Sequence, residues 1–373
     1  MVSRISELLN KYGHDVCSYF RSSSEINGSL AGHIRAFFSG IYSFSSRQRI
    51  RQIITDFKPD IIQVQNLYPL ISPSVLVEAG KHKVPVVMRC ANYRLICPNG
   101  LFLREGKICE KCAGGREWWC FLHNCEQNRF KSLGYYLRNY IARMRKYFLD
   151  NVTIYYAQTE FQRRRLIQEG FPADKVYVVP NMVTSNQVKL GRNAGQYVCS
   201  VGRISPEKDV STLMKAAKVC RDIQFKAAGS YNRLSCLSEQ APANFELCGH
   251  LEEEQLNKFY ANSRIFVLCS TCYDGFPSVI IEAMLHGKPV ICSRIGGLPE
   301  IIDDNITGLL FEPGNTDDLS EKIRYLWNKP ELCHSMGQAG RNKVLREYSP
   351  QKHYKRLMSV YSKAIELGSN GHS

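Results

Sequence analysis

The sequence contains no apolar run long enough to cross a membrane. Its longest runs, such as residues 265–269, have the length of a strand, whereas a membrane-spanning helix needs about 20 apolar residues. Residues 1–15 also lack the apolar core and the small-residue cleavage site of a secretory signal. We therefore expect a cytoplasmic protein without a transmembrane helix.

Several motifs of common enzymes are absent as well. The sequence has no Gly-x4-Gly-Lys-Ser/Thr loop, no Gly-x-Gly-x2-Gly fingerprint, no Gly-x-Ser-x-Gly elbow and no His-Glu-x2-His pair. It also has no Asp-x-Asp motif, which many enzymes use to hold a metal ion on a diphosphate. No internal repeat of about 20–50 residues is evident, which excludes a solenoid.

What is present is a globular composition with an uneven charge. Hydrophobic residues make up 44% and charged residues 22% of the 373 residues, a length that suits two domains better than one compact core. Of the net charge of +15, residues 1–185 carry 26 basic and 14 acidic side chains, a net +12. The remaining residues carry 23 and 20, a net +3. A basic first domain suits nucleic acid, an anionic membrane or a phosphorylated ligand, and charge alone does not choose among them.

The hydrophobic pattern alternates between helices and apolar strands, which indicates parallel sheets with helices on both faces. In the first half we expect helices at 3–12, 47–57, 72–82, 129–148 and 159–169, and strands at 14–20, 59–64, 85–88, 154–157 and 177–179. In the second half we expect strands at 197–201, 223–228, 245–248, 264–269 and 289–293, and helices at 209–220, 253–261, 278–286, 297–302, 316–328 and 350–366.

This pattern predicts two doubly wound, Rossmann-like α/β domains facing each other across a cleft. The first would cover residues 1–183, with a Cys-rich insertion at 94–128, and the second residues 196–348. The polar, turn-rich residues 184–195 would form the linker. The C-terminal helix within 349–373 would pack back toward the first domain. Ligands of such domains bind at the carboxyl ends of the strands.

Two loops at these strand ends carry candidate site residues. Asp274 and Glu282 bracket a turn between a strand and a helix. Between them, Gly275, Phe276, Pro277 and Ser278 lead into the start of that helix, and all of these except the proline have a backbone N–H group. A helix N-terminus is a ready anion site. Alternatively, Glu282 lies on a solvated helix face and Asp274 is an ordinary capping residue.

The second loop follows the first strand of the second domain. Gly202 permits close approach of the backbone, and Arg203 and Lys208 offer cationic donors at the same sheet edge. Together with the free helix end, these two cations would clamp a pyrophosphate. The alternative is a surface loop whose charges are solvated.

These motifs, in this order, resemble a family 4 glycosyltransferase of the retaining GT-B class. The resemblance rests on the Gly-Arg-x4-Lys loop, the two acids Asp274 and Glu282, the Gly-Gly-Leu-Pro-Glu run at 296–300 and the Asn-Ile-Thr-Gly-Leu-Leu-Phe run at 305–311. In the first half, residues 59–61, 67–73 and 93–100 are similar to bacterial enzymes of capsular polysaccharide, exopolysaccharide or O-antigen assembly.

The resemblance implies a role for each matching residue. Arg203 and Lys208 would neutralise the diphosphate of a nucleotide-sugar donor, Glu282 would bind the ribose hydroxyls and Asp274 the transferred sugar. Gly249 would meet the nucleobase. The implied reaction is metal-independent transfer of a hexose-like unit to an acceptor hydroxyl with retention, in a dry site whose cations stabilise the leaving diphosphate. No cofactor is then required.

The sequence also departs from this family. Asp274 replaces the usual Glu, Ala91 stands where a His is common near the reacting centre, and Gln63 and Gln65 stand where His is common in the subgroup. The chain begins with the helix at 3–12, so the first domain is expected to lack its opening strand. A catalytically impaired scaffold that still binds nucleotide sugar or a partner is therefore an alternative function.

Two features of the first half admit further interpretations. Cys97, Cys109, Cys112 and Cys125 include a Cys-x2-Cys pair and could hold a structural zinc ion, although reduced thiols packed under a loop explain them equally simply. The basic helix at 129–148 suits an anionic membrane surface and a lipid-linked saccharide acceptor, or is a core helix with a solvated basic face. A basic RNA-binding protein is an alternative from another functional class. No recognised nucleic-acid-binding motif supports it, so we expect no nucleic acid as a partner.

Overall fold

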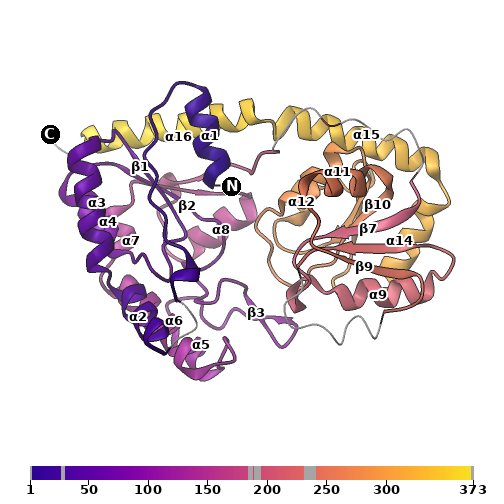
Figure 1. Ribbon diagram of the computed structural model, residues 1–373, viewed down its shortest axis with the longest axis horizontal. Coiled ribbons are helices and arrows are strands. Elements are labelled where there is room, and N and C mark those ends of the chain that lie inside the picture. Colours follow the sequence, from indigo (N-terminus) through magenta and orange to yellow (C-terminus); the bar gives the residue numbers. More distant parts are fainter. Residues whose placement is uncertain (1, 27–29, 184–187, 189–194, 231–240, 371–373) are drawn as a thin grey trace. The chain divides into compact units, whose positions relative to one another are not determined.

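The computed structural model describes residues 2–26, 30–183, 188, 195–230 and 241–370. The chain forms two compact units (Figure 1). The first contains residues 1–102, 109–179 and 354–373, and the second contains residues 103–108 and 180–353. Most of the expected linker at 184–195 lies outside the described residues.

A parallel four-stranded sheet forms the centre of the first unit. Its order is β1-β2-β5-β6, with β1 at Ile62–Gln65, β2 at Val86–Arg89, β5 at Ile154–Ala157 and β6 at Val176–Val178. In register, Val64 of β1 lies beside Met88 of β2, which lies beside Tyr155 of β5. All four residues of β2 and of β5 are buried, as expected for central strands covered on both faces.

The first unit has eight α-helices among its described residues, apart from the C-terminal helix. They are α1 (Val2–Lys11), α2 (Leu30–Ile41), α3 (Phe44–Phe57), α4 (Ser74–Lys81), α5 (Trp118–Leu122), α6 (Arg129–Met144), α7 (Tyr147–Asn151) and α8 (Glu160–Gln168). The 3-10 helices η1 (Ser23–Ile26) and η2 (Ala173–Lys175) complete it. Side chains of Ser43, Asn128 and Thr159 accept a backbone N–H at the starts of α3, α6 and α8, which satisfies donors that the first turn leaves free.

The second unit contains a parallel six-stranded sheet in the order β12-β11-β10-β7-β8-β9. The strands are β7 (Tyr197–Val201), β8 (Phe225–Ala228), β9 (Phe245–Gly249), β10 (Ser263–Leu268), β11 (Val290–Ser293) and β12 (Gly308–Phe311). The helices described around it are η3 (Pro206–Lys208), α9 (Val210–Val219), α11 (Glu253–Asn262), α12 (Ser278–Leu285), α13 (Leu298–Ile301), α14 (Thr316–Trp327) and α15 (Pro330–Glu347).

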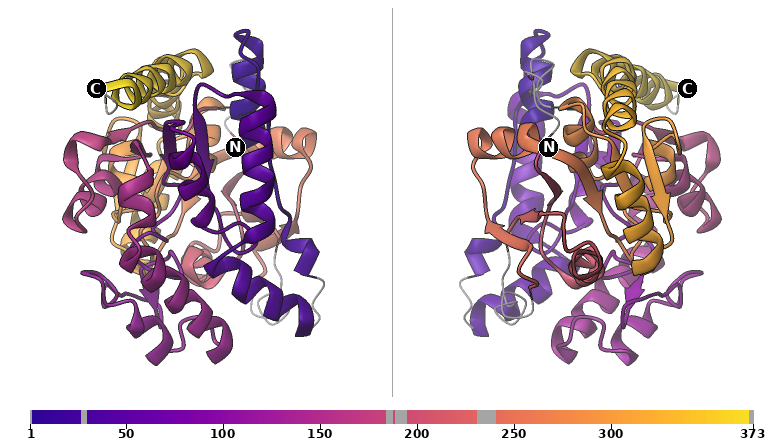
Figure 2. Two further views of the ribbon diagram at one scale, coloured as in Figure 1. Left: turned by 90° about the vertical axis from the view of Figure 1, so that its left-hand side faces the viewer. Right: turned by 90° about the vertical axis from the view of Figure 1, so that its right-hand side faces the viewer.

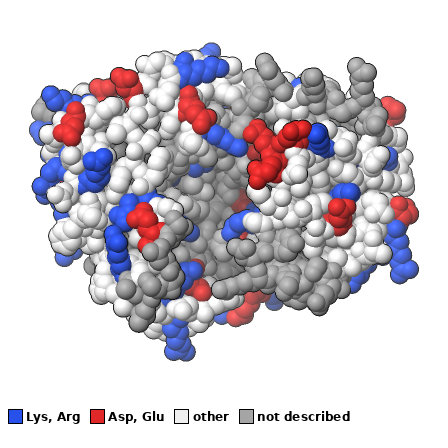
Figure 3. All heavy atoms as spheres, viewed as in Figure 1, with Lys and Arg blue, Asp and Glu red and all other residues white. Residues whose placement is uncertain are grey.

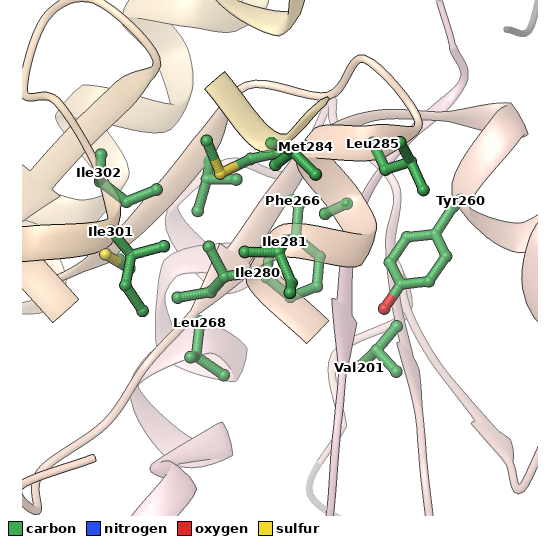
Figure 4. Packing of buried hydrophobic residues seen from close by; sticks show 14 of the residues in the cluster. Val201, Tyr260, Phe266, Leu268, Ile280, Ile281, Met284, Leu285, Ile301 and Ile302 are labelled. Carbon is green, nitrogen blue, oxygen red and sulfur yellow. The ribbon is translucent and has the colours of Figure 1, made fainter. Parts of the chain in front are cut away.

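Alternate residues of the central strand β10 serve two separate cores. Phe266 and Leu268 pack with Ile280 and Ile281 of α12 on one face (Figure 4). Ile265 and Val267 pack into the cluster formed by α9 and α14 on the other face. This period of two explains the continuous apolar run in the sequence, since a strand buried on both faces cannot alternate with polar residues.

The long C-terminal helix α16 (Pro350–Asn370) belongs to the first unit from Tyr354 onward. Tyr354 stacks on Tyr12 with ring centroids 3.8 Å apart, and its hydroxyl lies 2.9 Å from Nε2 of His14. Tyr361 donates its hydroxyl to Oε1 of Gln63 on β1. A short hairpin of β3 (Leu103–Arg104) and β4 (Lys107–Ile108) interrupts the Cys-rich stretch.

Two local expectations were wrong, and several elements were not expected. Residues 14–20 form no strand, because no neighbouring strand among the described residues pairs with them. The helix expected at 129–148 ends at Met144, and Lys146, with φ 48°, separates it from α7. The elements α2, α15 and β12 were not expected at all. No helix among the described residues has the length and apolar character needed to span a bilayer.

Candidate functional site

Three glycines draw together the carboxyl ends of β7, β8 and β9. Gly202 donates its N–H to the carbonyl of Ala228 at 3.0 Å, and Gly229 donates to the carbonyl of Gly249 at 2.7 Å. Gly229 has φ +154°, and a Cβ at this position would lie 1.7 Å from the carbonyl oxygen of Gly202. Only glycine permits this approach, so Gly229 fixes the backbone beside Gly202.

The loop after β7 is bound to the loop after β10. Thr271 donates its N–H to the carbonyl of Glu207 at 3.1 Å. Nζ of Lys208 donates to Oδ1 and Oδ2 of Asp274 at 2.6 and 2.7 Å. The Lys208 and Asp274 side chains are only 16% and 15% exposed. Two residues that are 66 positions apart therefore form one ion pair at the sheet edge.

Asp274 is held on several sides. Ser270 donates its hydroxyl to Oδ2 at 2.7 Å, and Gly297 donates its N–H to the Asp274 carbonyl at 3.2 Å. Gly296 has φ +59°, and a Cβ there would lie 3.0 Å from Cα of Tyr273. The Gly-Gly run at 296–297 thus packs directly against the backbone of the acidic loop.

Arg203 is the most accessible cation of this edge. Its side chain is 69% exposed, and Nη2 donates to Oε1 of Glu207 at 3.0 Å. The pair is i,i+4 and largely hydrated on the Arg203 side, so it contributes little rigidity. The Arg203 guanidinium carries further N–H donors in a planar fork.

Helix α12 begins directly after this loop. Its N-cap residue Pro277 provides no side-chain cap, so the first turn keeps N–H groups available for an anion. Asn181 donates its side-chain amide to the carbonyl of Phe276 at 2.9 Å, which holds the loop before the helix. Glu282, in the second turn of α12, accepts the Tyr260 hydroxyl at 3.4 Å. Burial raises the pKa of Tyr260 well above its usual value, so this hydroxyl stays protonated and donates.

The predicted residues thus fall into two groups. Gly202, Lys208 and Asp274 meet in one hydrogen-bonded edge, and Gly249 joins it through Gly229. A Cβ at Gly249, where φ is +70°, would meet no atom of the described residues within 4 Å. Glu282 forms the second group with Tyr260, whose hydroxyl orients its carboxylate.

Sequence reasoning missed Gly229, Ser270 and Tyr260. Gly229 follows β8 directly, as Gly202 follows β7, so a glycine at matching strand ends was a usable signal. Ser270 and Tyr260 had no such signal, because a serine and a tyrosine at these positions fit an ordinary loop and an ordinary core.

The departures expected in the first unit occupy defined places. Gln65 accepts Nη1 of Arg89 at 2.9 Å, and Gln63 accepts the Tyr361 hydroxyl. Ala91 is half-buried and lines a small hollow at the ends of β1 and β2. The two glutamines therefore take part in hydrogen bonds within the unit.

The structural zinc ion expected at Cys97, Cys109, Cys112 and Cys125 finds no support. In the part of the chain that the structure describes, no group of three or more His, Cys, Asp or Glu side chains is arranged to hold a metal ion. Cys97 donates its thiol to Oδ1 of Asn99 at 3.0 Å. Burial raises the pKa of the Cys97 and Cys112 thiols, and the neighbouring thiols of Cys97, Cys125 and Cys109 raise that of Cys112 further.

Helix α6 differs from a simple basic amphipathic helix. Arg138 is buried, at 4% exposed, whereas Phe130 and Met144 are 47% and 58% exposed. In the view of Figure 3, Lys and Arg side chains form separate groups rather than one continuous basic face.

Two family models match the chain in succession. One, described as "Glycosyl transferase 4-like domain", matches residues 2–182. The other, described as "Glycosyl transferases group 1", matches residues 184–343. Together they cover most of the 373 residues.

Two curated relatives show how far the similarity extends. An uncharacterized 42.6 kDa protein in the cps region of Klebsiella pneumoniae is 28% identical over 265 residues, which are 70% of this chain and 64% of that protein. The capsular polysaccharide biosynthesis glycosyltransferase CapM of Staphylococcus aureus is 29% identical over 173 residues, 43% of this chain and 44% of CapM. The matches thus span less than two thirds of the relatives' length.

A solved structure extends the likeness to the fold. Alr3699/HepE of Anabaena, crystallised in complex with UDP and glucose, aligns with a TM-score of 0.63 at 16% identity, over 85% of this chain and 80% of HepE. At this identity the comparison concerns architecture alone. The chain therefore belongs to the GT-B glycosyltransferases that join a glycosyltransferase 4-like domain to a group 1 domain.

Proposed function

We propose that this protein transfers a sugar from a nucleoside diphosphate sugar to an acceptor hydroxyl in cell-surface polysaccharide biosynthesis. The observation that carries the proposal is the Lys208–Asp274 pair, held at 2.6 Å beside Gly202 at the carboxyl ends of parallel strands. Such strand ends are where doubly wound sheets bind ligands. The names of CapM and HepE, a capsule glycosyltransferase and a protein bound to UDP and glucose, support this donor class.

The donor diphosphate would lie on Lys208, Arg203 and the first turn of α12. Nζ of Lys208 has three N–H groups, and the two contacts with Asp274 leave one for a phosphate oxygen. Arg203 is exposed enough to turn toward the same phosphate, and the residues from Gly275 to Ser278 would add backbone N–H donors and the helix dipole.

The other predicted residues would bind the rest of the donor. Glu282 would accept the ribose hydroxyls, since the Tyr260 hydroxyl already orients its carboxylate. Asp274 would contact hydroxyls of the transferred sugar, and Gly249 would meet the nucleobase, where the absence of a side chain leaves room. These assignments stay proposals for each residue.

We further propose that the reaction retains the anomeric configuration and needs no divalent ion. As the glycosidic bond breaks, negative charge grows on the leaving diphosphate, and prearranged cations lower the free energy of that transition state. Lys208 is held beside this position by Asp274, and Arg203 is exposed enough to turn toward it.

A catalytically impaired donor-binding protein is the second candidate, favoured by one observation. Ala91, where the family commonly has His, leaves no titratable group at that position of the hollow. In that case the nucleotide sugar would bind without turnover.

We also propose that the first unit docks on an anionic membrane that carries a lipid-linked acceptor. Large apolar side chains are exposed on α2, at the start of α3, on α5 and on α6. We call these side chains the apolar end of the first unit: Ile34, Phe38, Phe44, Leu122 and Phe130, which are 42–78% exposed. Helix α6 packs against both α2 and α5, and the exposed Arg35, Arg129 and Lys131 lie on the same helices. An apolar surface beside basic side chains suits an anionic bilayer.

The direct test is a donor screen on the full chain. UDP-, GDP- and ADP-sugars are screened by thermal shift and by donor hydrolysis, and the anomer of the released sugar is read by proton NMR. We expect one donor to raise the melting temperature and to be hydrolysed with retention, with activity unchanged by a metal chelator. Glu282→Gln should weaken donor binding about tenfold or more, because a charged hydrogen-bond acceptor is lost, and Glu253→Gln on α11 is the matched control.

The outcomes separate the two candidates. Donor binding without hydrolysis or transfer supports the impaired scaffold, and Ala91→His would then restore activity. Failure of all three donor classes to bind would contradict both.

A further inference from the structure

A small hollow in the first unit is lined by arginines and amides. It lies at the carboxyl ends of β1 and β2, and its polar lining includes Asn66, Tyr68, Arg89, Asn92 and Arg94. Among the described residues that line it, none is Asp or Glu. Its small size suits one anionic group rather than a whole ligand.

Arg89 supplies a buried charge at this place. It is the last residue of β2, is 7% exposed, and donates Nη1 to Oε1 of Gln65 at 2.9 Å. Burial lowers the pKa of Arg89, and Tyr156 and Cys90 act in the opposite direction. A buried guanidinium is stabilised by an anion that enters beside it.

Arg94 has donor capacity left over. Its Nη1 donates to Oδ1 of Asn66 at 3.2 Å, while its buried Nε has no hydrogen-bond partner among the described residues. None of the ion pairs found in the described chain includes Arg94. The buried Tyr68 hydroxyl also has no partner there, and burial raises its pKa to about 12, so it keeps its proton.

Helix α6 holds these groups in position and adds a third charge. Asn139 donates its side-chain amide to the Arg94 carbonyl at 2.6 Å. The guanidinium of Arg138 lies 4.2 Å from the ring centroid of Tyr68 and donates to the carbonyl of Pro98 at 2.5 Å. Glu126 is the acid that acts electrostatically on Arg138, and its carboxylate already pairs with Nζ of Lys131 at 2.6 Å. The surroundings therefore stay positive.

We propose that this hollow binds a phosphate group carried by the acceptor, held by Arg89, Arg94 and the Tyr68 hydroxyl. Two guanidinium groups balance the charge of one phosphate monoester, and their planar N–H forks match its oxygens. The inference rests on the proposed transferase function, because it names the chemical class of the acceptor. The phosphate would come from a soluble sugar phosphate or from a lipid headgroup, which offer the same chemistry.

The test uses the full chain saturated with UDP, so that the strand ends of the second unit are occupied. Glycerol 3-phosphate is titrated by calorimetry at low ionic strength, with glycerol as the ligand control. We expect glycerol 3-phosphate to bind, glycerol not to bind, and Arg94→Gln to weaken the phosphate at least about tenfold. Arg145→Gln, an equal change of charge at the exposed end of α6, should change it less than about twofold.

Further experiments distinguish a lipid-borne from a soluble phosphate and allow for a variant that does not fold. To detect a lipid-borne phosphate, sedimentation is compared for phosphatidylcholine vesicles that contain either phosphatidic acid or phosphatidylglycerol. If the phosphate belongs to a lipid, Arg94→Gln weakens binding only to the vesicles with phosphatidic acid. If the source is soluble, Arg94→Gln changes binding to neither vesicle but still weakens glycerol 3-phosphate in the calorimeter. If Arg94→Gln does not fold, Arg94→Lys replaces it in the test. Because this variant keeps the charge, it should bind glycerol 3-phosphate with an affinity below that of the wild type. Equal binding by wild type and Arg94→Gln, or equal loss in Arg145→Gln, overturns the inference. UDP binding, measured first, reports separately on the proposed function.

Discussion

Glu78 on α4 is a buried carboxylate that holds two helices together. It is 1% exposed, and its oxygens lie 2.6 Å from Nη2 of Arg47 and 2.6 Å from Nε of Arg51, both on α3. The hydrogen bond from Arg51, with help from Arg47 and against burial, lowers the pKa of Glu78 to about 2. The carboxylate form is therefore favoured in the folded state.

Glu78→Gln should lower the free energy of unfolding of the first unit by roughly 2–4 kcal/mol at neutral pH, because it leaves the two arginines without their anion. Since the folded pKa lies below the unfolded one, this stabilisation is complete above about pH 4.5 and disappears as the pH falls toward about 2. Urea unfolding can follow Trp118 and Trp119 in a Trp327→Phe background, with the exposed Glu366→Gln as control. An unchanged difference between wild type and variant at low pH would refute the assigned cause.

At this scale the sequence predicts residue types better than partners. Lys208 and Asp274 were expected on different parts of a donor, and their ion pair spans 66 positions that no local pattern connects. The contact of Glu78 with Arg47 spans 31 positions and was not expected either. Both depend on which strand or helix packs beside which, and that information is absent from a local motif.

The strand ends of the second unit make a sharper prediction at the scale of elements. Gly229→Ala places a methyl group 1.7 Å from the Gly202 carbonyl at φ +154°. We expect a loss of about 2 kcal/mol or more in stability, together with weaker nucleotide binding, because the loop after β7 must move. Gly314→Ala is the control for backbone strain alone, because φ is +75° and no atom of the described residues would lie within 4 Å of the added Cβ. Thermal melts and UDP titrations of both variants check this, and equal effects would show that the close approach is unimportant.

The apolar end of the first unit gives the second prediction at this scale. Phe38 and Phe44 are 64% and 78% exposed. Phe38→Ser combined with Phe44→Ser should weaken the affinity for anionic vesicles about a hundredfold or more, because burial of each aromatic contributes about 1.5–3 kcal/mol to docking. Ile306 is an exposed apolar side chain of the second unit, and Ile306→Ser should leave binding to the vesicles unchanged. Wild-type protein that ignores anionic vesicles would contradict the docking proposal.

The elements that the sequence missed have physical reasons. The buried face of α15 includes Gly337 and Gly340, which look like helix breakers. A Cβ at Gly337 would lie 1.9 Å from the Gly287 carbonyl, so the glycine is there for close packing. Residues 14–20 have a strand-like composition, but Tyr19 donates its hydroxyl to Ser46 and His14 contacts Tyr354 instead of a sheet. Regular alternation and buried apolar runs, in contrast, placed β5, β7 and β10 within one or two residues.

For the whole molecule, the order of motifs was more informative than any single one. The Gly-Arg-x4-Lys loop, the acidic loop and the Gly-Gly run converge because β7, β10 and β11 are neighbours in one parallel sheet. Arg89 and Arg94, which line the hollow of the first unit, belong to the more basic half of the sequence. The family follows from both halves together, each matched by its own model.

The central claim is that the second unit binds the diphosphate of a nucleotide through Lys208. Its most direct test is calorimetric titration of the full chain with UDP, GDP and ADP, for the wild type, Lys208→Ala and the control Lys258→Ala on α11. We expect that at least one nucleotide binds, that Lys208→Ala weakens its affinity about tenfold to a hundredfold through loss of a charged contact, and that Lys258→Ala leaves the affinity unchanged. Absence of binding by all three nucleotides, or equal affinity of wild type and Lys208→Ala, would contradict it.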